Sequence, residues 1–231
     1  MERFDKDISV IFPAYNEEEN VEACVLIAHC ILKELVKDFE IILVNDGSTD
    51  RTKAICLDLE KRLNKVKVIY KEKNEGYGYA LRDGFRAAKF DLVFFSDSDR
   101  QFDMYNLKYL LPYSDEYDLV IGYRRNRQDP LKRRLFSLCY NLLIRLMFKL
   151  NVKDINCAFK LFKKKIFDKI EIGSKQYVVN TEILAKARAL GYTIKELGVS
   201  HFPRYEGDSK VGGSDILHTI NEVIKIKRRL S

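Results

Sequence analysis

Short apolar runs alternate with stretches of helical periodicity along the first half of the chain. Five runs have the length and composition of buried strands, at residues 8–12, 41–44, 66–70, 92–95 and 119–121. Between the first two runs, Val21, Cys24 and Ala28 recur at the spacing of one helix face. We expect this helix to begin at Asn16, with the acids at residues 17–19 in its first turn, where they suit the positive end of the helix dipole.

Two more helices are expected in this half, at residues 49–63 and directly after the glycine-rich residues 74–78. Strands that alternate with helices in this way pack as a parallel sheet with helices on both faces. The sequence therefore predicts an α/β fold with a Rossmann-like, mostly parallel central sheet flanked by helices.

The second half has a different pattern. Three segments are candidates for helices, at residues 131–150, 181–190 and 215–230. Residues 159–162 and 193–202 are typical of additional strands. The length suits one full α/β domain, and we find no repeat, linker or low-complexity segment, so we expect a single domain over residues 1–231.

Basic residues outnumber acidic ones, and the net charge is +7. They concentrate in a few runs, such as residues 124–134 and 225–229, which favours an anionic partner. Five cysteines and three histidines lack the spacing of a disulfide framework or a zinc site. The charged start has no apolar signal-peptide core behind it, and no apolar run reaches the roughly 18–20 residues of a membrane span, so we expect a cytoplasmic protein.

Two acids at the carboxyl end of the fourth predicted strand form the most informative motif. Asp97 and Asp99 follow the apolar residues 92–95, and residues two apart in an extended chain point to the same side. Two carboxylates held close together repel unless a cation or a proton lies between them. With the amide of Gln101 beside them, they form an oxygen-only ligand set that suits Mg²⁺ or Mn²⁺.

Polar clusters also follow the other predicted strands. Residues 13–17, 45–50 and 122–124 would meet the acid pair at one edge of the sheet, where open α/β sheets bind ligands. Asp46 could accept hydrogen bonds from a nucleobase or a ribose, and Tyr15 could stack on a base. The chain has neither the glycine fingerprint of dinucleotide-binding folds nor the lysine motif of P-loop enzymes, which disfavours both classes.

These clusters resemble the motifs of family 2 glycosyltransferases with the GT-A fold. The matching segments are Val10-Ile11-Phe12-Pro13-Ala14-Tyr15-Asn16-Glu17, Val44-Asn45-Asp46-Gly47-Ser48-Thr49-Asp50, Asn74-x-Gly76-x-Gly78-x-Ala80-Leu81-x-x-Gly84 and Asp97-x-Asp99-x-Gln101. One departure is Asn45, where many members of the family have an acid. The order and spacing of these motifs cover the first half of the chain.

The resemblance implies roles for individual residues on the donor side. The residues implied to hold the nucleotide of a sugar donor are Pro13, Tyr15, Glu17, Asp46 and Asp97. The residues implied to hold a divalent cation, Mg²⁺ or Mn²⁺, on its diphosphate are Asp97, Asp99 and Gln101.

The second half is similar to polyprenyl (dolichyl) phosphate sugar transferases of the same family, over segments within residues 122–160 and 204–210. The residues implied to grip the acceptor phosphate are Arg124, Arg133 and Ser137. The loop that is implied to close over the donor carries Arg204 and Lys210. Asp99, Arg124 and Arg204 are the residues implied in catalysis, and Lys160 stands where an arginine is expected.

We therefore expect metal-dependent, inverting transfer of a hexosyl group, with GDP-mannose as the leading donor, to a polyprenyl (dolichyl) phosphate. An ionised phosphate acceptor needs cationic partners more than a general base. Residues 1–124 would form the nucleotide-sugar-binding half, and residues 125–231 the half that faces the acceptor and the membrane. The enzyme would lie peripherally on the cytoplasmic face, and nucleic acid is not expected as a partner.

The helix predicted at residues 131–150 fits an acceptor with an apolar tail. Leu135, Leu138, Leu142, Leu146 and Leu150 lie close to one face, and basic residues beside them can reach lipid headgroups. A core helix with a solvated, charged side is the alternative interpretation.

Other functions stay open. A family 2 glycosyltransferase that uses a UDP-sugar and a sugar hydroxyl acceptor, in cell-envelope polysaccharide synthesis, needs a catalytic base, and Asp154 is the one candidate. A nucleic-acid-binding module is disfavoured because the basic runs lack interleaved aromatic residues. A non-catalytic membrane scaffold is a further class. Glu182 is a candidate contact of the donor sugar, although local capping explains an acid there equally well.

Overall fold

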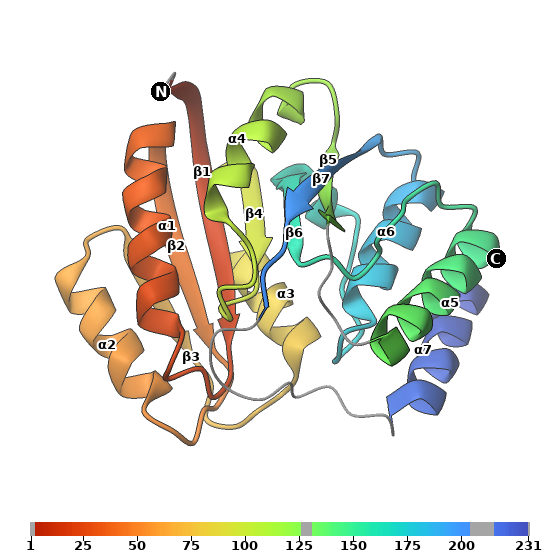
Figure 1. Cartoon of the computed structure of the whole chain (residues 1–231), viewed down its shortest axis with the longest axis horizontal. Coiled ribbons are helices and arrows are strands. Elements are labelled where there is room, and N and C mark those ends of the chain that lie inside the picture. Colours follow the sequence, from red (N-terminus) through yellow and green to blue (C-terminus); the bar gives the residue numbers. More distant parts are fainter. Residues whose placement is uncertain (1–2, 126–130, 204–214, 231) are drawn as a thin grey trace.

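The computed structural model describes residues 3–125, 131–203 and 215–230, and within them all side chains except those of residues 131–133 and 215–218. A seven-stranded sheet with the order β3-β2-β1-β4-β6-β5-β7 runs through the molecule (Figure 1). Its strands are β1 (Phe4–Ala14), β2 (Val36–Asn45), β3 (Val66–Tyr70), β4 (Leu92–Ser96), β5 (Leu119–Arg125), β6 (Phe159–Lys163) and β7 (Ile194–Ser200).

Helices flank this sheet on both faces (Figure 1). The α-helices of the described chain are α1 (Val21–Leu35), α2 (Thr52–Arg62), α3 (Tyr77–Ala87), α4 (Leu107–Leu110), α5 (Leu131–Phe148), α6 (Val179–Ala189) and α7 (Asp215–Leu230). Short 3₁₀ helices are η1 (Met104–Asn106), η2 (Leu111–Ser114) and η3 (Lys164–Asp168). The predicted α/β fold class is confirmed, and each predicted strand is present.

One strand runs against the others. β6 pairs antiparallel with both β4 and β5, whereas the remaining neighbours in the sheet are parallel. The residues that precede β6 therefore arrive at the edge where β1, β2, β4 and β5 end. This edge collects polar segments from both halves of the chain.

The start predicted for the first helix is wrong, because α1 begins at Val21 rather than at Asn16. Asn16 has a φ of +52°, which no helical residue adopts. Its Oδ1 accepts a hydrogen bond from the backbone N–H of Thr49 at 2.8 Å, and the N–H of Glu17 donates to Thr52 Oγ1 at 2.8 Å. These bonds tie the residues after β1 to the loop after β2, so they cannot begin a helix.

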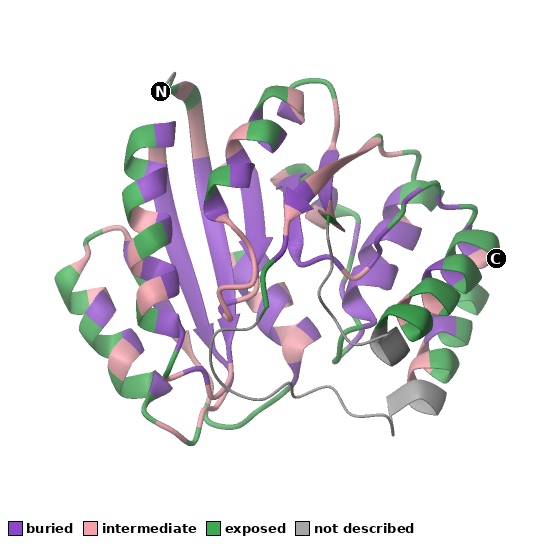
Figure 2. Ribbon diagram, viewed as in Figure 1, coloured by how far each residue is buried: buried purple, intermediate pink, exposed green. Residues whose placement is uncertain are grey.

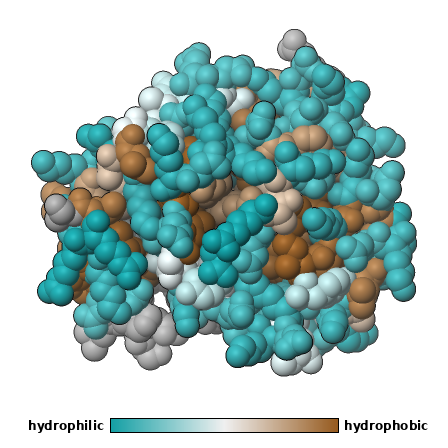
Figure 3. All heavy atoms as spheres, turned by 180° about the vertical axis from the view of Figure 1, so that it is seen from behind, coloured by the Kyte–Doolittle hydropathy of each residue, from teal (hydrophilic) through white to brown (hydrophobic). Residues whose placement is uncertain are grey.

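Two apolar layers cover the sheet. Alternate residues of a strand point to opposite faces. Accordingly, Val10 and Phe12 of β1 pack in the layer with α1, α2 and α4, while Ile11 packs in the layer with α3, α5, α6 and α7. Figure 2 shows the central strands buried and the outward sides of the helices exposed. The face seen in Figure 3 is largely hydrophilic and is interrupted by separate hydrophobic patches.

Candidate functional site

Hydrogen bonds join the polar segments at the carboxyl edge of the sheet. Ser98, which lies between the two acids after β4, donates from Oγ to the carbonyl oxygen of Pro13 at 2.9 Å. The backbone N–H of Asn16 donates to Ser48 Oγ at 3.0 Å. The segments after β1, β2 and β4 are thus brought together, as the strand order of the sequence predicted.

The acid pair lies half-buried at the end of β4. The hydroxyl of Tyr77 donates to Asp97 Oδ1 at 2.8 Å, and the backbone N–H of Gln101 donates to Asp99 Oδ1 at 3.1 Å. Burial, together with the nearby Asp99 carboxylate, raises the pKa of Asp97 to about 7. Tyr77 is a residue of this site that the sequence did not single out, although it directly follows Gly76 of the glycine-rich motif.

These residues fit a divalent cation. A cation between the two carboxylates would relieve the repulsion that contributes to the raised pKa of Asp97. The amide of Gln101 donates from Nε2 to the carbonyl oxygen of Phe202 at 3.1 Å, so Oε1 is the amide atom suited to a metal. The described residues contain no cluster of three or more His, Cys, Asp or Glu side chains that could hold a metal alone. Mg²⁺ usually needs only one or two carboxylates beside substrate phosphates and water.

Asp46 holds the glycine-rich loop that precedes α3. Its carboxylate accepts the backbone N–H groups of Glu75 at 3.1 Å and of Gly76 at 2.9 Å, and Lys71 Nζ lies 3.6 Å from Oδ1. Gly76 has a φ of +107°, and a Cβ there would lie 2.4 Å from the carbonyl oxygen of Lys175. This loop-holding role was not predicted. The contact of Asp46 with a nucleoside stays a prediction.

Glu182 does not cap its own helix, α6, but holds the loop before that helix, and its contact with a donor sugar stays a prediction. It is 1% exposed, and it accepts hydrogen bonds from the backbone N–H of Ser174 at 2.8 Å and from Lys186 Nζ at 2.7 Å. Burial raises the pKa of Glu182, but these hydrogen bonds outweigh it and hold the pKa below its usual value. The loop that it fixes packs on α3, where the N–H of Gly78 donates to the carbonyl oxygen of Lys175 at 2.8 Å.

A pocket of about 440 Å³ lies among β5, α5 and the segment before β6. Its lining residues are Tyr123, Arg124, Arg134, Leu135, Ser137, Leu138, Asn141, Lys153 and Asp154. Two of the three residues predicted for an acceptor phosphate, Arg124 and Ser137, therefore line one pocket. The side chain of Arg133 is outside the described residues. Arg134 and Lys153 add positive charge that the sequence analysis did not assign to this pocket.

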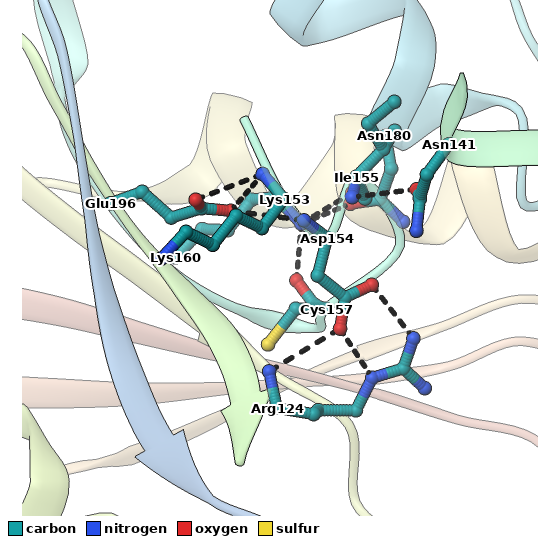
Figure 4. Close-up of polar contacts among 9 residues, drawn as sticks. All are labelled: Arg124, Asn141, Lys153, Asp154, Ile155, Cys157, Lys160, Asn180 and Glu196. Atoms are coloured by element: carbon teal, nitrogen blue, oxygen red, sulfur yellow. Dashed lines mark hydrogen bonds and ion pairs between the residues drawn. The ribbon is translucent and has the colours of Figure 1, made fainter. Parts of the chain in front are cut away.

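Arg124 is held in the pocket by Asp154 (Figure 4). Arg124 Nε lies 2.7 Å from Asp154 Oδ2, and Nη2 lies 2.8 Å from Oδ1. Such a two-point contact fixes the plane of the guanidinium group. The hydrogen bonds also stabilise the charged form of the carboxylate. This makes Asp154 a poor general base and weighs against an enzyme that activates a sugar hydroxyl through it.

The segment that carries Asp154 is fastened from several elements (Figure 4). Glu196 of β7 accepts the backbone N–H of Lys153 at 2.8 Å and of Asp154 at 3.0 Å. Asn141 of α5 accepts the N–H of Ile155 at 3.1 Å. The position of Arg124 therefore depends on contacts that reach from the far strand of the sheet to α5.

One face of α5 is apolar and exposed. Leu135, Leu138, Leu142 and Leu146 form this face, which we call the α5 apolar face, and each is more than half exposed. Ile144, on the other side of the helix, is fully buried in the core. The prediction that Leu150 belongs to the exposed face is wrong, because α5 ends at Phe148 and Leu150 packs into the core. Figure 2 shows α5 mostly green along its outer side. No helix within the described ranges is long and apolar enough to cross a membrane.

The other predicted donor residues occupy the same edge. Pro13 is buried, Tyr15 is half-buried, and Glu17 is 9% exposed and accepts from Asn20 Nδ2 at 3.1 Å. Arg204 and Lys210, predicted for a loop that closes over the donor, lie outside the described residues. The roles of all five stay predictions.

Comparison with known proteins identifies the family. The sequence profile of glycosyl transferase family 2 matches residues 9–171. The chain belongs to glycosyltransferase family 2. This confirms the family predicted from the motifs after β1, β2 and β4.

Two curated relatives match nearly all of this family 2 glycosyltransferase. It is 31% identical to glycosyltransferase AglD of Haloferax volcanii, over 92% of this chain and 37% of AglD. It is 28% identical to the undecaprenyl-phosphate 4-deoxy-4-formamido-L-arabinose transferase of Photorhabdus laumondii, over 95% of this chain and 67% of the relative. The chain thus spans little more than a third of the length of AglD.

Solved structures show the same fold. Glucosyl-3-phosphoglycerate synthase from Mycobacterium tuberculosis, in complex with Mn²⁺ and UDP-glucose, has a TM-score of 0.74 to this family 2 glycosyltransferase. The two chains are 20% identical, and the match covers 97% of this chain and 79% of the synthase. The synthase in complex with UDP also has a TM-score of 0.74, at 19% identity. The predicted GT-A fold is confirmed.

Proposed function

We propose that this enzyme transfers a hexosyl group from a nucleotide sugar to a polyprenyl phosphate at a membrane surface. The observation that carries the proposal is that Leu135 and Leu138 belong both to the pocket of Arg124 and to the α5 apolar face. A ligand with a phosphate head and an apolar tail matches both parts. The name of the Photorhabdus laumondii relative, which specifies undecaprenyl phosphate, supports this acceptor.

The donor would bind at the carboxyl edge of the sheet. Asp97, Asp99 and Gln101 would hold Mg²⁺ or Mn²⁺ there, a role supported by the Mn²⁺ in the similar synthase structure. Such a cation, when bound, neutralises charge on a leaving diphosphate. Tyr15 and Asp46 are proposed to bind the nucleotide with Pro13 and Glu17, and Arg204 and Lys210 to add positive charge over the diphosphate.

The acceptor phosphate is already an anion near neutral pH, so it needs positive charge rather than a proton acceptor. Arg124, fixed in plane by Asp154, and Ser137 offer a charged and a neutral donor for its oxygens. Arg134 and Lys153 add positive charge around them, and Arg133 is proposed to do the same. One displacement by the phosphate oxygen would invert the anomeric centre.

The finer assignments extend this proposal. Mannose from GDP-mannose is the leading donor, and dolichyl phosphate is one acceptor of the proposed class. Residues 1–124 would serve the donor and residues 125–231 the acceptor, with the enzyme attached peripherally to the cytoplasmic face of the membrane. An enzyme that uses a UDP-sugar and a sugar hydroxyl is the alternative, which the pairing of Asp154 with Arg124 disfavours.

A thermal-shift panel tests the donor site. Incubated with Mn²⁺ and GDP-mannose, UDP-glucose, UDP-galactose or UDP-N-acetylglucosamine, the protein is expected to gain stability with one donor. At a hundredfold excess over Kd the gain is about 2.7 kcal/mol, which corresponds to a rise in Tm of roughly 5–11 °C. EDTA should remove most of it, because the cation would neutralise the charge of the diphosphate beside Asp97 and Asp99. A panel in which no sugar nucleotide raises the Tm contradicts the donor proposal.

The acceptor is tested with the selected donor carrying a labelled sugar. With undecaprenyl phosphate in detergent, label should enter an organic-extractable, acid-labile lipid. Undecaprenol, which has the same tail and no phosphate, should give none. Transfer to a soluble saccharide, without transfer to the phospholipid, would favour the hydroxyl-directed alternative.

Binding to a membrane should depend on the α5 apolar face. The triple substitution of Leu138, Leu142 and Leu146 by serine is expected to weaken binding to anionic vesicles by at least about tenfold, because each buried leucine contributes roughly 1.5–3 kcal/mol. Sedimentation with phosphatidylglycerol-containing vesicles measures the effect. A control with the exposed Leu57 and Leu190 changed to serine should bind as the wild type does. Equal binding of all three proteins contradicts the role of α5.

A further inference from the structure

Lys160 is a buried lysine beside the acceptor pocket. It is the second residue of β6, opposite Phe95 of β4, and is 1% exposed. Lysine is almost never fully buried without a partner, because removing an ammonium group from water is costly. An apolar residue at this strand position would avoid that cost. The contacts of the ammonium group therefore indicate what Lys160 does.

The ammonium group uses its three donors on three oxygen atoms (Figure 4). Lys160 Nζ donates to the carbonyl oxygen of Ile155 at 3.0 Å, to Asn180 Oδ1 at 2.9 Å and to the carbonyl oxygen of Cys157. None of these three acceptors is a carboxylate. The ammonium group thus donates to two backbone carbonyl groups of one turn and to a side-chain amide in the first turn of α6.

The turn that accepts these hydrogen bonds, at residues 155–157, directly follows Asp154. Glu196 and Asn141 hold the backbone N–H groups of this segment from β7 and α5, and Lys160 holds its carbonyl groups from β6. Asp154 in turn fixes the guanidinium group of Arg124. Lys160 is therefore linked to Arg124 through the turn and one ion pair.

We propose that Lys160 is a positioning residue for the acceptor phosphate, because its charged hydrogen bonds fix the turn at residues 155–157 and so set Asp154 and Arg124 at the pocket. The identity of the ligand rests on the proposed function. The positioning of the turn does not.

Burial lowers the pKa of Lys160 to about 8. Cys157 of the turn, Asp154 before it and Asp97 after β4 raise this pKa, while Arg124 of β5 lowers it, and the effect of burial is larger than that of these charges together. A neutral amine has two N–H groups in place of three, so loss of the proton removes one of the three hydrogen bonds. The hydrogen bonding of Lys160 to the turn should therefore weaken as the pH rises through about 8.

The experiment measures binding of undecaprenyl phosphate in detergent micelles, with undecaprenol as the phosphate-free control. At pH 7.5, Lys160→Met is expected to weaken binding of undecaprenyl phosphate on the order of tenfold, as loss of an orienting partner commonly does. The Mn²⁺-dependent shift in Tm with the selected donor should be retained, because Lys160 donates its hydrogen bonds to Ile155, Cys157 and Asn180 and not to a proposed donor residue. Lys163→Met, on the same strand, is the matched control and should bind as the wild type does.

The pH profile separates positioning from simple packing. Binding of undecaprenyl phosphate by the wild type should fall between pH 7.5 and 9. The ligand itself stays fully ionised in this range, because the second pKa of its phosphate is about 6. Lys160→Arg, which stays charged, should remove this fall. Asn180→Asp places a carboxylate beside the ammonium group, raises the pKa of Lys160, and should move the fall to higher pH.

Each result decides the inference. The inference is overturned if Lys160→Met binds undecaprenyl phosphate with wild-type affinity. It is also overturned if wild type, Lys160→Arg and Asn180→Asp show the same loss of binding at alkaline pH. The comparison of these three proteins remains decisive if Lys160→Met does not fold. Equal binding of the two lipids by the wild type would overturn the proposed acceptor. Hydrogen exchange at residues 153–157 would then still decide whether Lys160 holds the turn, with faster exchange expected in Lys160→Met than in Lys163→Met.

Discussion

Replacement of Asp99 by alanine is expected to lower the rate of sugar transfer by roughly 10²–10³-fold or more, the usual effect of removing a group that stabilises developing charge. Asp99 is one of two acids proposed to hold the cation, and its carboxylate lies at the end of β4 beside Asp97. Without it, the proposed cation would lose a ligand, and the leaving diphosphate would lose neutralising charge. Steady-state transfer of labelled sugar to undecaprenyl phosphate measures the loss.

The same variant should lose the Mn²⁺-dependent part of the Tm shift with the selected sugar nucleotide. Its own Tm should not fall, because removing one of two repelling carboxylates relieves unfavourable charge. Asp103→Ala is the control, since Asp103 lies four residues further along and its carboxylate accepts from the N–H of Tyr105. Transfer by Asp99→Ala within tenfold of the Asp103→Ala rate would rule out Asp99 as a metal ligand.

Replacement of Arg124 by methionine is expected to affect stability and function together. The side chain of Asp154 is only 7% exposed, and the variant leaves its carboxylate buried without the guanidinium group. Breaking a buried pair in this way typically costs about 3–5 kcal/mol of the free energy of unfolding. Urea unfolding, read at constant m-value, measures the loss. Binding of undecaprenyl phosphate should be lost as well.

The double variant Arg124→Met with Asp154→Leu separates the two effects. Replacing both members of a buried ion pair by apolar residues is often neutral or stabilising, so the double variant should regain most of the lost stability. It should still fail to bind undecaprenyl phosphate, because the guanidinium group proposed to contact the acceptor phosphate is absent. Recovery of binding together with stability would show that Arg124 acts only through the fold.

Several features followed from local pattern. Apolar runs in alternation with helical periodicity predicted the α/β sheet, because burial on both faces requires apolar residues at nearly every position of a strand. The acids at residues 97 and 99 and the cluster at residues 45–50 could be placed at one edge, because parallel strands end on the same side. The motifs after these strands were sufficient for the family.

Other features depended on partners distant in sequence. The direction of β6 follows from its place between β4 and β5, and the residue pattern of a five-residue strand does not specify its direction. Asn16 is not part of the helix, because the backbone N–H of Thr49, 33 residues away, donates to its side chain. Local periodicity contains no information about such contacts.

The alternation of elements, the polar residue types at the strand ends and the family were therefore determined by the sequence alone. The tertiary structure decided the partners of the charged groups. Arg124 pairs with Asp154, which lies 30 residues away in the sequence, and Lys160 of β6 is buried because the turn before β6 and Asn180 of α6 accept its hydrogen bonds. The physical reason is that the free energy of a buried charge depends on which dipoles and charges the whole fold brings within hydrogen-bonding distance.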